Sequence, residues 1–190
     1  MAEAAKRIRA PFDDETARSL RAGDRVLITG TILAARDAAH KRLVETLDRG
    51  EPLPVDLKGQ VVYYVGPSPA QPGQAIGAAG PTTSGRMDAY TPQLLRLGLN
   101  CMIGKGRRSD AVRQAMQEYG AVYLGAVGGA AALIARSILS SEVLAYPDLG
   151  TEAIHRFTVK DFPAIVLMDA HGGNLYESGP AQYRQKSGQP

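Results

Sequence analysis

A strand–helix–strand unit within residues 100–124 constrains the fold of this chain more than any other feature. Residues 100–103 and 121–124 are two short apolar runs of strand length. Between them, Ser109 is a favoured helix N-cap residue, and apolar side chains from Val112 onward recur at helical spacing. A helical connection between two strands of one sheet is right-handed and leaves the strands parallel. The sequence therefore predicts an α/β domain that contains a parallel sheet.

Patterns elsewhere predict further elements of the same kind. Short β-rich runs predict strands, whereas apolar residues at helical spacing predict helices. Expected strands lie at residues 6–11, 25–32, 60–65, 142–146, 154–159 and 162–169, with a hairpin at 172–174. Expected helices follow Asp13, span residues 36–47 and 91–97, and run through an Ala-rich stretch from Gly128 to Leu139. Residues 68–80 are too rich in Gly and Pro for regular structure, and we expect a loop that forms a flap over a functional site.

Composition limits the number of domains and the classes of partner. With 190 residues and 44% hydrophobic residues, the chain can form one domain with a real core. We expect an N-terminal arm at 1–22, a domain at 23–178 and a disordered polar tail at 179–190. The net charge of +3 is spread along the chain and there is no Trp, so no nucleic-acid surface is expected. No apolar run approaches the roughly 18 residues of a membrane-spanning helix and no leader is evident, which predicts a cytoplasmic protein without a membrane segment.

The segment at residues 80–88, Gly-Pro-Thr-Thr-Ser-Gly-Arg-Met-Asp, has the composition of an anion-binding loop. Gly80 and Gly85 can adopt positive φ and allow the backbone to approach a ligand. Three hydroxyls and the guanidinium of Arg86 lie between or beside these glycines. The alternative interpretation is an ordinary polar turn, which the same composition also favours.

Two other segments place a cation near a predicted strand end, as Arg86 does. Arg36 follows the strand at 25–32 and precedes a helix, and Lys105 follows the strand at 100–103. In open α/β sheets the carboxyl ends of parallel strands bring such positions together. We therefore predict that Arg36, Thr82, Arg86 and Lys105 converge on one open patch.

In this order and at these distances, the segments at 31–42, 80–88 and 102–107 resemble the C-terminal region of class I fumarate hydratases. More closely, the chain is similar to the free-standing β subunit of the two-subunit fumarase and L(+)-tartrate dehydratase family. The resemblance runs from about Gly23 to Gly173 and includes three further segments, at 63–67, 127–131 and 148–153. It implies a swivelling β/β/α three-layer domain with a parallel and an antiparallel sheet.

The resemblance also implies roles for individual residues. Arg36, Arg86 and Lys105 match positions that hold substrate carboxylates, and Thr82 matches the proposed base. A free alcohol is too weak a base near neutral pH unless its pKa is strongly depressed. The alternative role of Thr82 is to donate a hydrogen bond to the developing oxyanion. The neighbouring hydroxyls, Thr83 and Ser84, are further candidates for substrate binding.

Three other side chains are weaker candidates for the site: Asp37, His40 and Asp88. Asp37 and His40 fall on one helical face, where a carboxylate and an imidazole could assist the chemistry. Each also has a structural interpretation, Asp37 as a first-turn helix residue and His40 as a partly buried donor. Asp37 or Asp88 could neutralise the cations. His155 and His171 belong to no motif.

The chain has one cysteine, Cys101, in an apolar run. The resemblance implies a [4Fe–4S] cluster held by three cysteines in another region of the enzyme, and one thiolate cannot replace them. It therefore implies a cluster-bearing α subunit as partner, with an α2β2 assembly or a β–β contact, and predicts that this chain contributes half of an active site.

Three functions compete at this stage. The first is the β subunit of a hydro-lyase acting on fumarate and malate, with tartrate or a related 2-hydroxy dicarboxylate as the alternative substrate. The second is a non-catalytic module that binds small anions, which the Gly-flanked cations alone would support. The third is a structural partner of a larger enzyme.

Overall fold

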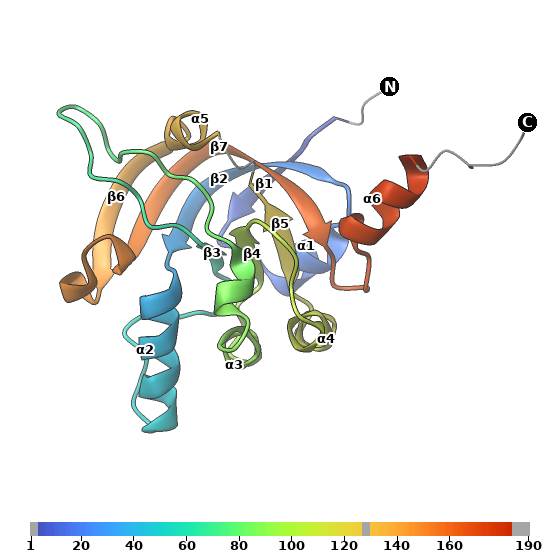
Figure 1. Cartoon of the computed structure of the whole chain (residues 1–190), viewed down its shortest axis with the longest axis horizontal. Helices are drawn as coiled ribbons and strands as arrows, with labels where there is room; N and C mark the ends of the chain where they lie inside the picture. The colour runs from blue at the N-terminus through green and yellow to red at the C-terminus, as the bar shows by residue number, and fades with distance from the viewer. Residues whose placement is uncertain (1–3, 127–129, 184–190) are drawn as a thin grey trace, which may run out of the picture.

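The computed structural model describes residues 4–126 and 130–183 (Figure 1). Within them, seven strands form one mixed sheet in the order β1-β2-β3-β4-β5-β7-β6. Strands β1 to β5 are parallel to their neighbours, whereas β7 runs antiparallel to β2, β5 and β6. The bounds are β1 (Lys6–Ala10), β2 (Arg25–Ala34), β3 (Val61–Tyr63), β4 (Cys101–Gly104), β5 (Val122–Gly125), β6 (Ile138–Ala145) and β7 (Ile154–Met168).

The sheet closes on itself. Strand β7 pairs with β5 and also with β2 along most of its length, so β2, β3, β4, β5 and β7 form a ring, and β1 and β6 extend it on the outside. The register of β2 against β7 shifts between Ile28 and Gly30, where β7 has one residue more than β2, as in a β-bulge. Gly30 has φ 127°, and a Cβ there would lie 2.0 Å from the carbonyl oxygen of Ala10. Only glycine therefore fits where β2 pairs with the end of β1.

Alternate residues of the ring strands enter two different cores. In β3 and β4, Tyr63 and Ile103 lie in a core inside the ring, whereas Val62 and Met102 lie in a core outside it. Helices α2 (Asp37–Asp48), α3 (Thr91–Arg96) and α4 (Asp110–Tyr119) cover the outer face of the parallel strands (Figure 1). The other elements are helices α1 (Asp14–Ser19), α5 (Ala131–Ala135) and α6 (Leu175–Tyr183) and the 3-10 turns η1 (Ser84–Met87) and η2 (Pro147–Glu152).

The prediction of an α/β domain with parallel strands is confirmed. Strands β4 and β5 are parallel neighbours, and α4 connects them. The side chain of Ser109 accepts a hydrogen bond from the backbone N–H of Val112, as expected of an N-cap. Gly120 ends the helix in the left-handed conformation, with φ 78°.

Three predictions about the second half of the chain are wrong in part. The Ala-rich helix ends at Ala135, because pairing with Val159 draws Ile138 into β6; the start predicted at Gly128 lies outside the described residues. The strands predicted at 154–159 and 162–169 are one strand, since the ladder continues past Asp161. Residues 179–183 of the predicted tail belong to α6, which follows the expected tight turn at 172–174.

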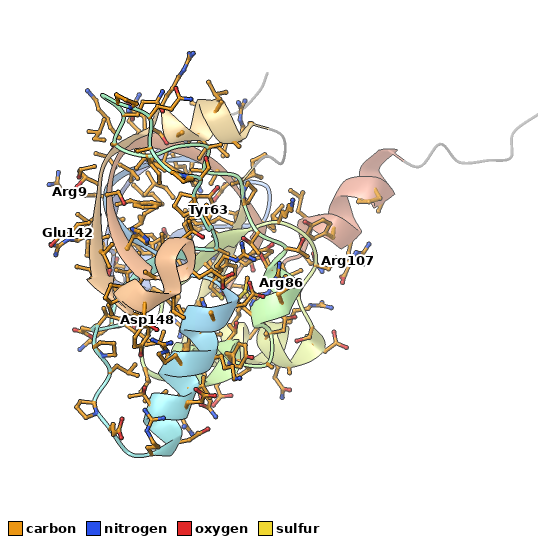
Figure 2. All side chains as sticks on the ribbon, turned by 60° about the vertical axis from the view of Figure 1, so that its left-hand side comes forward. Arg9, Tyr63, Arg86, Arg107, Glu142 and Asp148 are labelled. Atoms are coloured by element: carbon orange, nitrogen blue, oxygen red, sulfur yellow. The ribbon has the colours of Figure 1, made fainter. Side chains whose placement is uncertain are left out.

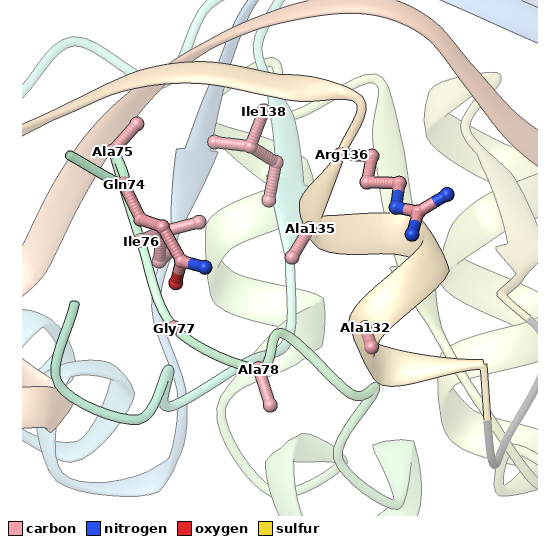
Figure 3. A pocket seen from close by; sticks show the side chains of 9 residues that line it. All are labelled: Gln74, Ala75, Ile76, Gly77, Ala78, Ala132, Ala135, Arg136 and Ile138. Atoms are coloured by element: carbon pink, nitrogen blue, oxygen red, sulfur yellow. The ribbon is translucent and has the colours of Figure 1, made fainter. Parts of the chain in front are cut away.

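The loop at 68–80 has no helix or strand, as predicted, but it does not form a flap over the cations. Ile76 and Ala79 are buried in the inner core, and the backbone N–H of Ala79 donates to the carbonyl of Ala131 at 3.3 Å. Residues 74–78 and α5 instead border a cavity of about 360 Å³, where Arg136 contributes the one charged side chain (Figure 3). No helix in the described part of the chain is long and apolar enough to cross a membrane.

Candidate functional site

The candidate site lies at the carboxyl ends of β2, β3 and β4. Arg36 follows β2, Tyr64 follows β3 and Lys105 follows β4. The loop at 80–88 is attached to this edge, because the N–H of Thr82 donates to the carbonyl of Tyr64 at 2.7 Å and its carbonyl accepts from the N–H of Lys105 at 3.3 Å. The N–H of Ser84 donates to the carbonyl of Lys105 at 2.8 Å. The loop therefore lies beside the end of β4 like a short additional strand.

Arg36 and Arg86 meet at the carboxylate of Asp37. Nε of Arg36 donates to Oδ2 of Asp37 at 3.0 Å, and Nε of Arg86 donates to Oδ1 at 2.6 Å. Figure 2 shows Arg86 at the surface beside the first turn of α2. The predicted convergence of these two arginines is therefore observed, and the expected neutralising carboxylate is Asp37.

Asp37 is an anion at neutral pH. Partial burial alone would raise the pKa of this carboxyl group, but the hydrogen bond from Arg36 and the charge of Arg86 outweigh it and hold the pKa below its usual value. The site therefore contains two guanidinium ions on one carboxylate. This arrangement relieves part of the repulsion between the two cations.

Glu152 is a site residue that the sequence analysis did not select. It projects from η2, and its Oε2 accepts the backbone N–H of Ala38 at 3.1 Å, in the first turn of α2. Its Oε1 lies 3.5 Å from Nε of Arg36. Asp148 in the same turn accepts two hydrogen bonds from Arg42, each at 2.8 Å, which attaches η2 to α2. The segment at 148–153 had contributed to the resemblance, and its acidic residues were the available signal.

The three successive hydroxyls of the loop occupy different environments. Thr82 is partly buried and Thr83 is exposed, whereas Ser84 is fully buried. Oγ of Ser84 accepts a hydrogen bond from the Tyr123 hydroxyl at 2.9 Å, and a Cβ on Gly104 would lie 2.0 Å from this Oγ. The structure therefore directs Ser84 into the protein as an anchor of the loop, and it leaves Thr82 and Thr83 nearer to a ligand.

Asp88 is directed away from the cations of the candidate site. Its Oδ1 accepts from Nε of Arg108 at 2.7 Å, and its Oδ2 accepts from the N–H of Ser109 at 2.6 Å. The side chain of Arg108 has no exposed surface and lies over the rings of Tyr64 and Tyr123, at 5.3 and 5.0 Å. Asp88 therefore anchors the end of the loop to a buried arginine. Nothing in the sequence distinguishes Arg108 from its exposed neighbour Arg107.

His40 is buried beneath the site. Its Nδ1 donates to the carbonyl of Arg36 at 2.9 Å, and its ring meets that of Tyr64 edge to face at 5.2 Å. Burial lowers the pKa of the imidazole to about 4. His40 is therefore neutral at pH 7 and supports the backbone at the start of α2, as the structural interpretation holds.

The pKa of His40 predicts a specific dependence of stability on pH. The folded chain binds the imidazole proton only near pH 4, whereas the unfolded chain binds it below about 6.5, so the free energy of unfolding falls by up to about 3 kcal/mol as the pH falls between these values. His40→Asn keeps a donor to the Arg36 carbonyl but cannot titrate. We expect urea unfolding to show a shallower loss of stability in this variant across the window. Equal slopes in both proteins would contradict the assignment.

The glycines of the loop differ from expectation. Gly80 and Gly85 do not have positive φ, whereas Gly106, after β4, has φ 83°. A Cβ on Gly80 would lie 3.2 Å from Cβ of Ala131, so close packing against α5 accounts for this glycine.

Lys105 is exposed and forms no ion pair with any described residue. Cavities of about 360, 300 and 380 Å³ lie elsewhere in the described part of the chain.

These features define an α/β domain that presents a cationic cluster, held by one aspartate, at the carboxyl ends of its parallel strands. The chain belongs to the fumarase C-terminus family, which it matches over residues 3–179. The resemblance found in the sequence is thereby confirmed.

Relatives of the chain differ in how much of their length it covers. It is 45% identical over 155 residues to the aerobic class I fumarate hydratase of Escherichia coli (strain K12), which is 80% of this chain and 28% of that protein. It is 43% identical over 156 residues to fumarate hydratase 2 of Leishmania major, again 28% of that protein. It is also 37% identical over 166 residues to a Methanocaldococcus jannaschii protein provisionally named L(+)-tartrate dehydratase subunit beta, covering 84% of this chain and 85% of the relative.

Proposed function

We propose that this chain is the β subunit of an iron–sulfur hydro-lyase that catalyses the reversible hydration of fumarate to L-malate. The observation that carries the proposal is the meeting of Arg36 and Arg86 at Asp37, beside a loop that is hydrogen-bonded to Lys105. The names of the fumarate hydratase relatives support the reaction, and the near-complete match to a protein named as a β subunit supports the role of subunit.

The chemistry requires cations on the substrate carboxylates. When a base removes a proton next to a carboxylate, negative charge moves onto that carboxylate, so a fixed cation there stabilises the transition state more than the ground state. Arg36, Arg86 and Lys105 are proposed to bind the two carboxylates. Thr82 is proposed to act as the base or to donate a hydrogen bond to the developing oxyanion, with Thr83 as a further contact.

The residues of this chain do not fit an iron–sulfur cluster. Cys101 is the only cysteine in the sequence; it is fully buried, and burial raises the pKa of its thiol. The described residues contain no group of three or more His, Cys, Asp or Glu side chains arranged for a metal ion. We propose that a [4Fe–4S] cluster belongs to a separate α subunit, and that this chain contributes the cations that bind the substrate carboxylates and a possible base.

The assembly and its location are part of the same proposal. We propose a cytoplasmic enzyme in which a cluster-bearing α subunit covers the open site. The assembly is proposed to be an α2β2 tetramer or to contain a contact between two β subunits. The domain that begins at residue 23 is proposed to be a swivelling β/β/α three-layer unit, with the arm at 1–22 adding β1 to its sheet. Pairing of β1 with β2 supports the role of the arm.

A second candidate substrate is L(+)-tartrate. The Methanocaldococcus relative named for tartrate dehydratase has nearly the same extent as this chain, and tartrate also presents two carboxylates to the same cations. We propose that specificity for fumarate or tartrate depends on contacts from the α subunit as well as on contacts from this site.

A reconstitution experiment tests the proposed function. We expect the purified chain to be colourless, free of iron and inactive, and to become active when combined anaerobically with a larger chain that carries cluster-ligating cysteines. Activity is measured on fumarate, malate, tartrate and other 2-hydroxy acids. A brown isolated chain with stoichiometric iron would contradict the division of the site between two chains. An inactive pair that still binds dicarboxylates would favour the non-catalytic anion-binding module.

A further inference from the structure

Each of the two site arginines is held by a hydrogen bond from its own Nε atom. Arg36 and Arg86 each donate Nε–H to a different oxygen of Asp37. A guanidinium group is planar and rigid, so a bond that fixes Nε–H also fixes the directions of its other four N–H groups. One carboxylate therefore sets the orientation of two cations that come from different segments of the chain.

The terminal nitrogens of both groups remain available. Within residues 4–126 and 130–183, neither Arg36 nor Arg86 makes a hydrogen bond through Nη1 or Nη2. Arg108, by contrast, uses its Nη atoms on Thr91 and Met102 and is fully buried. The two site arginines keep the donors that bind a carboxylate as a fork.

The surroundings of Arg36 limit its movement. A Cβ on Gly66 would lie 2.9 Å from Cδ and 3.0 Å from Nη1 of Arg36, so the arginine lies directly over this glycine. Glu152 approaches its Nε from η2 at 3.5 Å. Arg36 is thus confined between Gly66, Asp37 and Glu152, in a geometry that exists before any ligand binds.

We propose that Asp37 is a positioning residue, which aligns the Nη donors of Arg36 and Arg86 so that together they bind a carboxylate group of the substrate. The identity of the ligand, a small dicarboxylate, rests on the proposed function. The alignment of the two arginines does not. Asp37 does not touch the reacting atoms. Its contribution is to remove the cost of ordering two flexible, mutually repelling side chains when the ligand arrives.

Two other roles for Asp37 predict different results on substitution. If Asp37 occupied the position of the substrate carboxylate and had to be displaced, Asp37→Asn would tighten anion binding, because a competing negative charge is removed. If Asp37 served only the first turn of α2, the variant would be less stable with unchanged binding. If Asp37 aligns the two arginines, Asp37→Asn should instead weaken anion binding, although the substitution makes the site more positive.

The first test uses the isolated full-length chain and needs no activity. Nitrogen-15 NMR of the arginine side chains follows the Nε–H signals of Arg36 and Arg86 during titration with succinate, a dicarboxylate that cannot be hydrated. We expect Asp37→Asn to shift both signals and to weaken succinate binding by about tenfold or more, because one Nε–H loses its acceptor and the other keeps only a neutral oxygen. Arg49, whose Nε donates to Glu51 at 3.0 Å, provides an internal reference signal. Glu51→Gln is the matched control, and it should leave succinate binding unchanged.

The second test measures kinetics in the reconstituted enzyme. We expect Asp37→Asn to raise KM for the substrate by about tenfold or more with a smaller change in kcat, the pattern of lost substrate binding. Gly66→Ala provides a second variant: the backbone at Gly66 accepts alanine, and the added methyl group displaces Arg36 alone. It should raise KM while leaving the Arg86 Nε–H signal in place.

The outcomes separate the inference from the proposed function. Unchanged or tighter succinate binding in Asp37→Asn, or no measurable binding to the wild-type chain, overturns the inference. Weaker binding in Asp37→Asn supports it even if the reconstituted enzyme is inactive on every dicarboxylate, and that inactivity would count against the proposed function only.

Discussion

We expect Arg86→Lys to lower kcat/KM of the reconstituted enzyme by well over tenfold, which is about 2 kcal/mol or more of transition-state stabilisation. Lysine keeps the positive charge, but it loses both the Nε bond to Asp37 and the planar pair of donors that matches a carboxylate. The loss should therefore arise from geometry rather than from charge. Steady-state kinetics on fumarate and malate measure it.

The matched control for this prediction is Arg49→Lys. Arg49 is also an exposed arginine with an Nε bond to a carboxylate, but it lies at the opposite end of α2 from the site. Its replacement should leave activity within about twofold, the ordinary range for a surface change. If Arg86→Lys gave an effect equally small, the loop at 80–88 would be a scaffold and not a binding element.

The largest expected effect on stability is that of Asp88→Ala. This change leaves the guanidinium of Arg108 charged, fully buried and without its ionic partner, and breaking a buried pair in this way costs about 3–5 kcal/mol. We expect a corresponding fall in the free energy of unfolding from urea denaturation. The loop should also lose its attachment to α4, because the N–H of Ser109 loses its acceptor.

Asp148→Ala is the control for the buried pair. Asp148 accepts two hydrogen bonds from Arg42, as good in distance as those of Asp88, but both partners are exposed to solvent. Pairs of this kind contribute little to stability, because water screens them. Equal destabilisation by the two substitutions would show that burial of Arg108 does not set the strength of its ion pair.

Local patterns in the sequence were sufficient for α4 and for the position of Arg36 and Lys105. Ser109 and Gly120 mark the ends of α4 by their own backbone requirements, and Arg36 and Lys105 follow strands whose apolar runs are short and distinct. Positions immediately after parallel strands share one edge of the sheet by geometry alone. The shared edge of Arg36 and Lys105 could therefore be predicted without knowledge of any contact, whereas Arg86 joins them through the hydrogen bonds that attach the loop at 80–88.

Contacts between distant segments were not predictable in this way. Thr82, Thr83 and Ser84 are similar in the sequence, and their different exposure depends on the hydrogen bonds to Tyr64 and Lys105 that no local pattern encodes. Arg108 is buried because Tyr64, Tyr123 and Asp88 surround it, whereas its own neighbours in the sequence are those of a surface loop. Gly104 is required only because Ser84 turns toward it.

Closure of the ring by β7 has a consequence for the order in which the site can form during synthesis. Strand β2 is made early, but its longest partner is β7, close to the end of the described chain. Glu152, which contacts Arg36 and caps α2, precedes β7 directly. Contacts of such large sequence separation form slowly and late. A ribosome must therefore release almost the whole domain before the arginines reach their aligned positions, and a shortened nascent chain has no competent surface to offer to a second subunit.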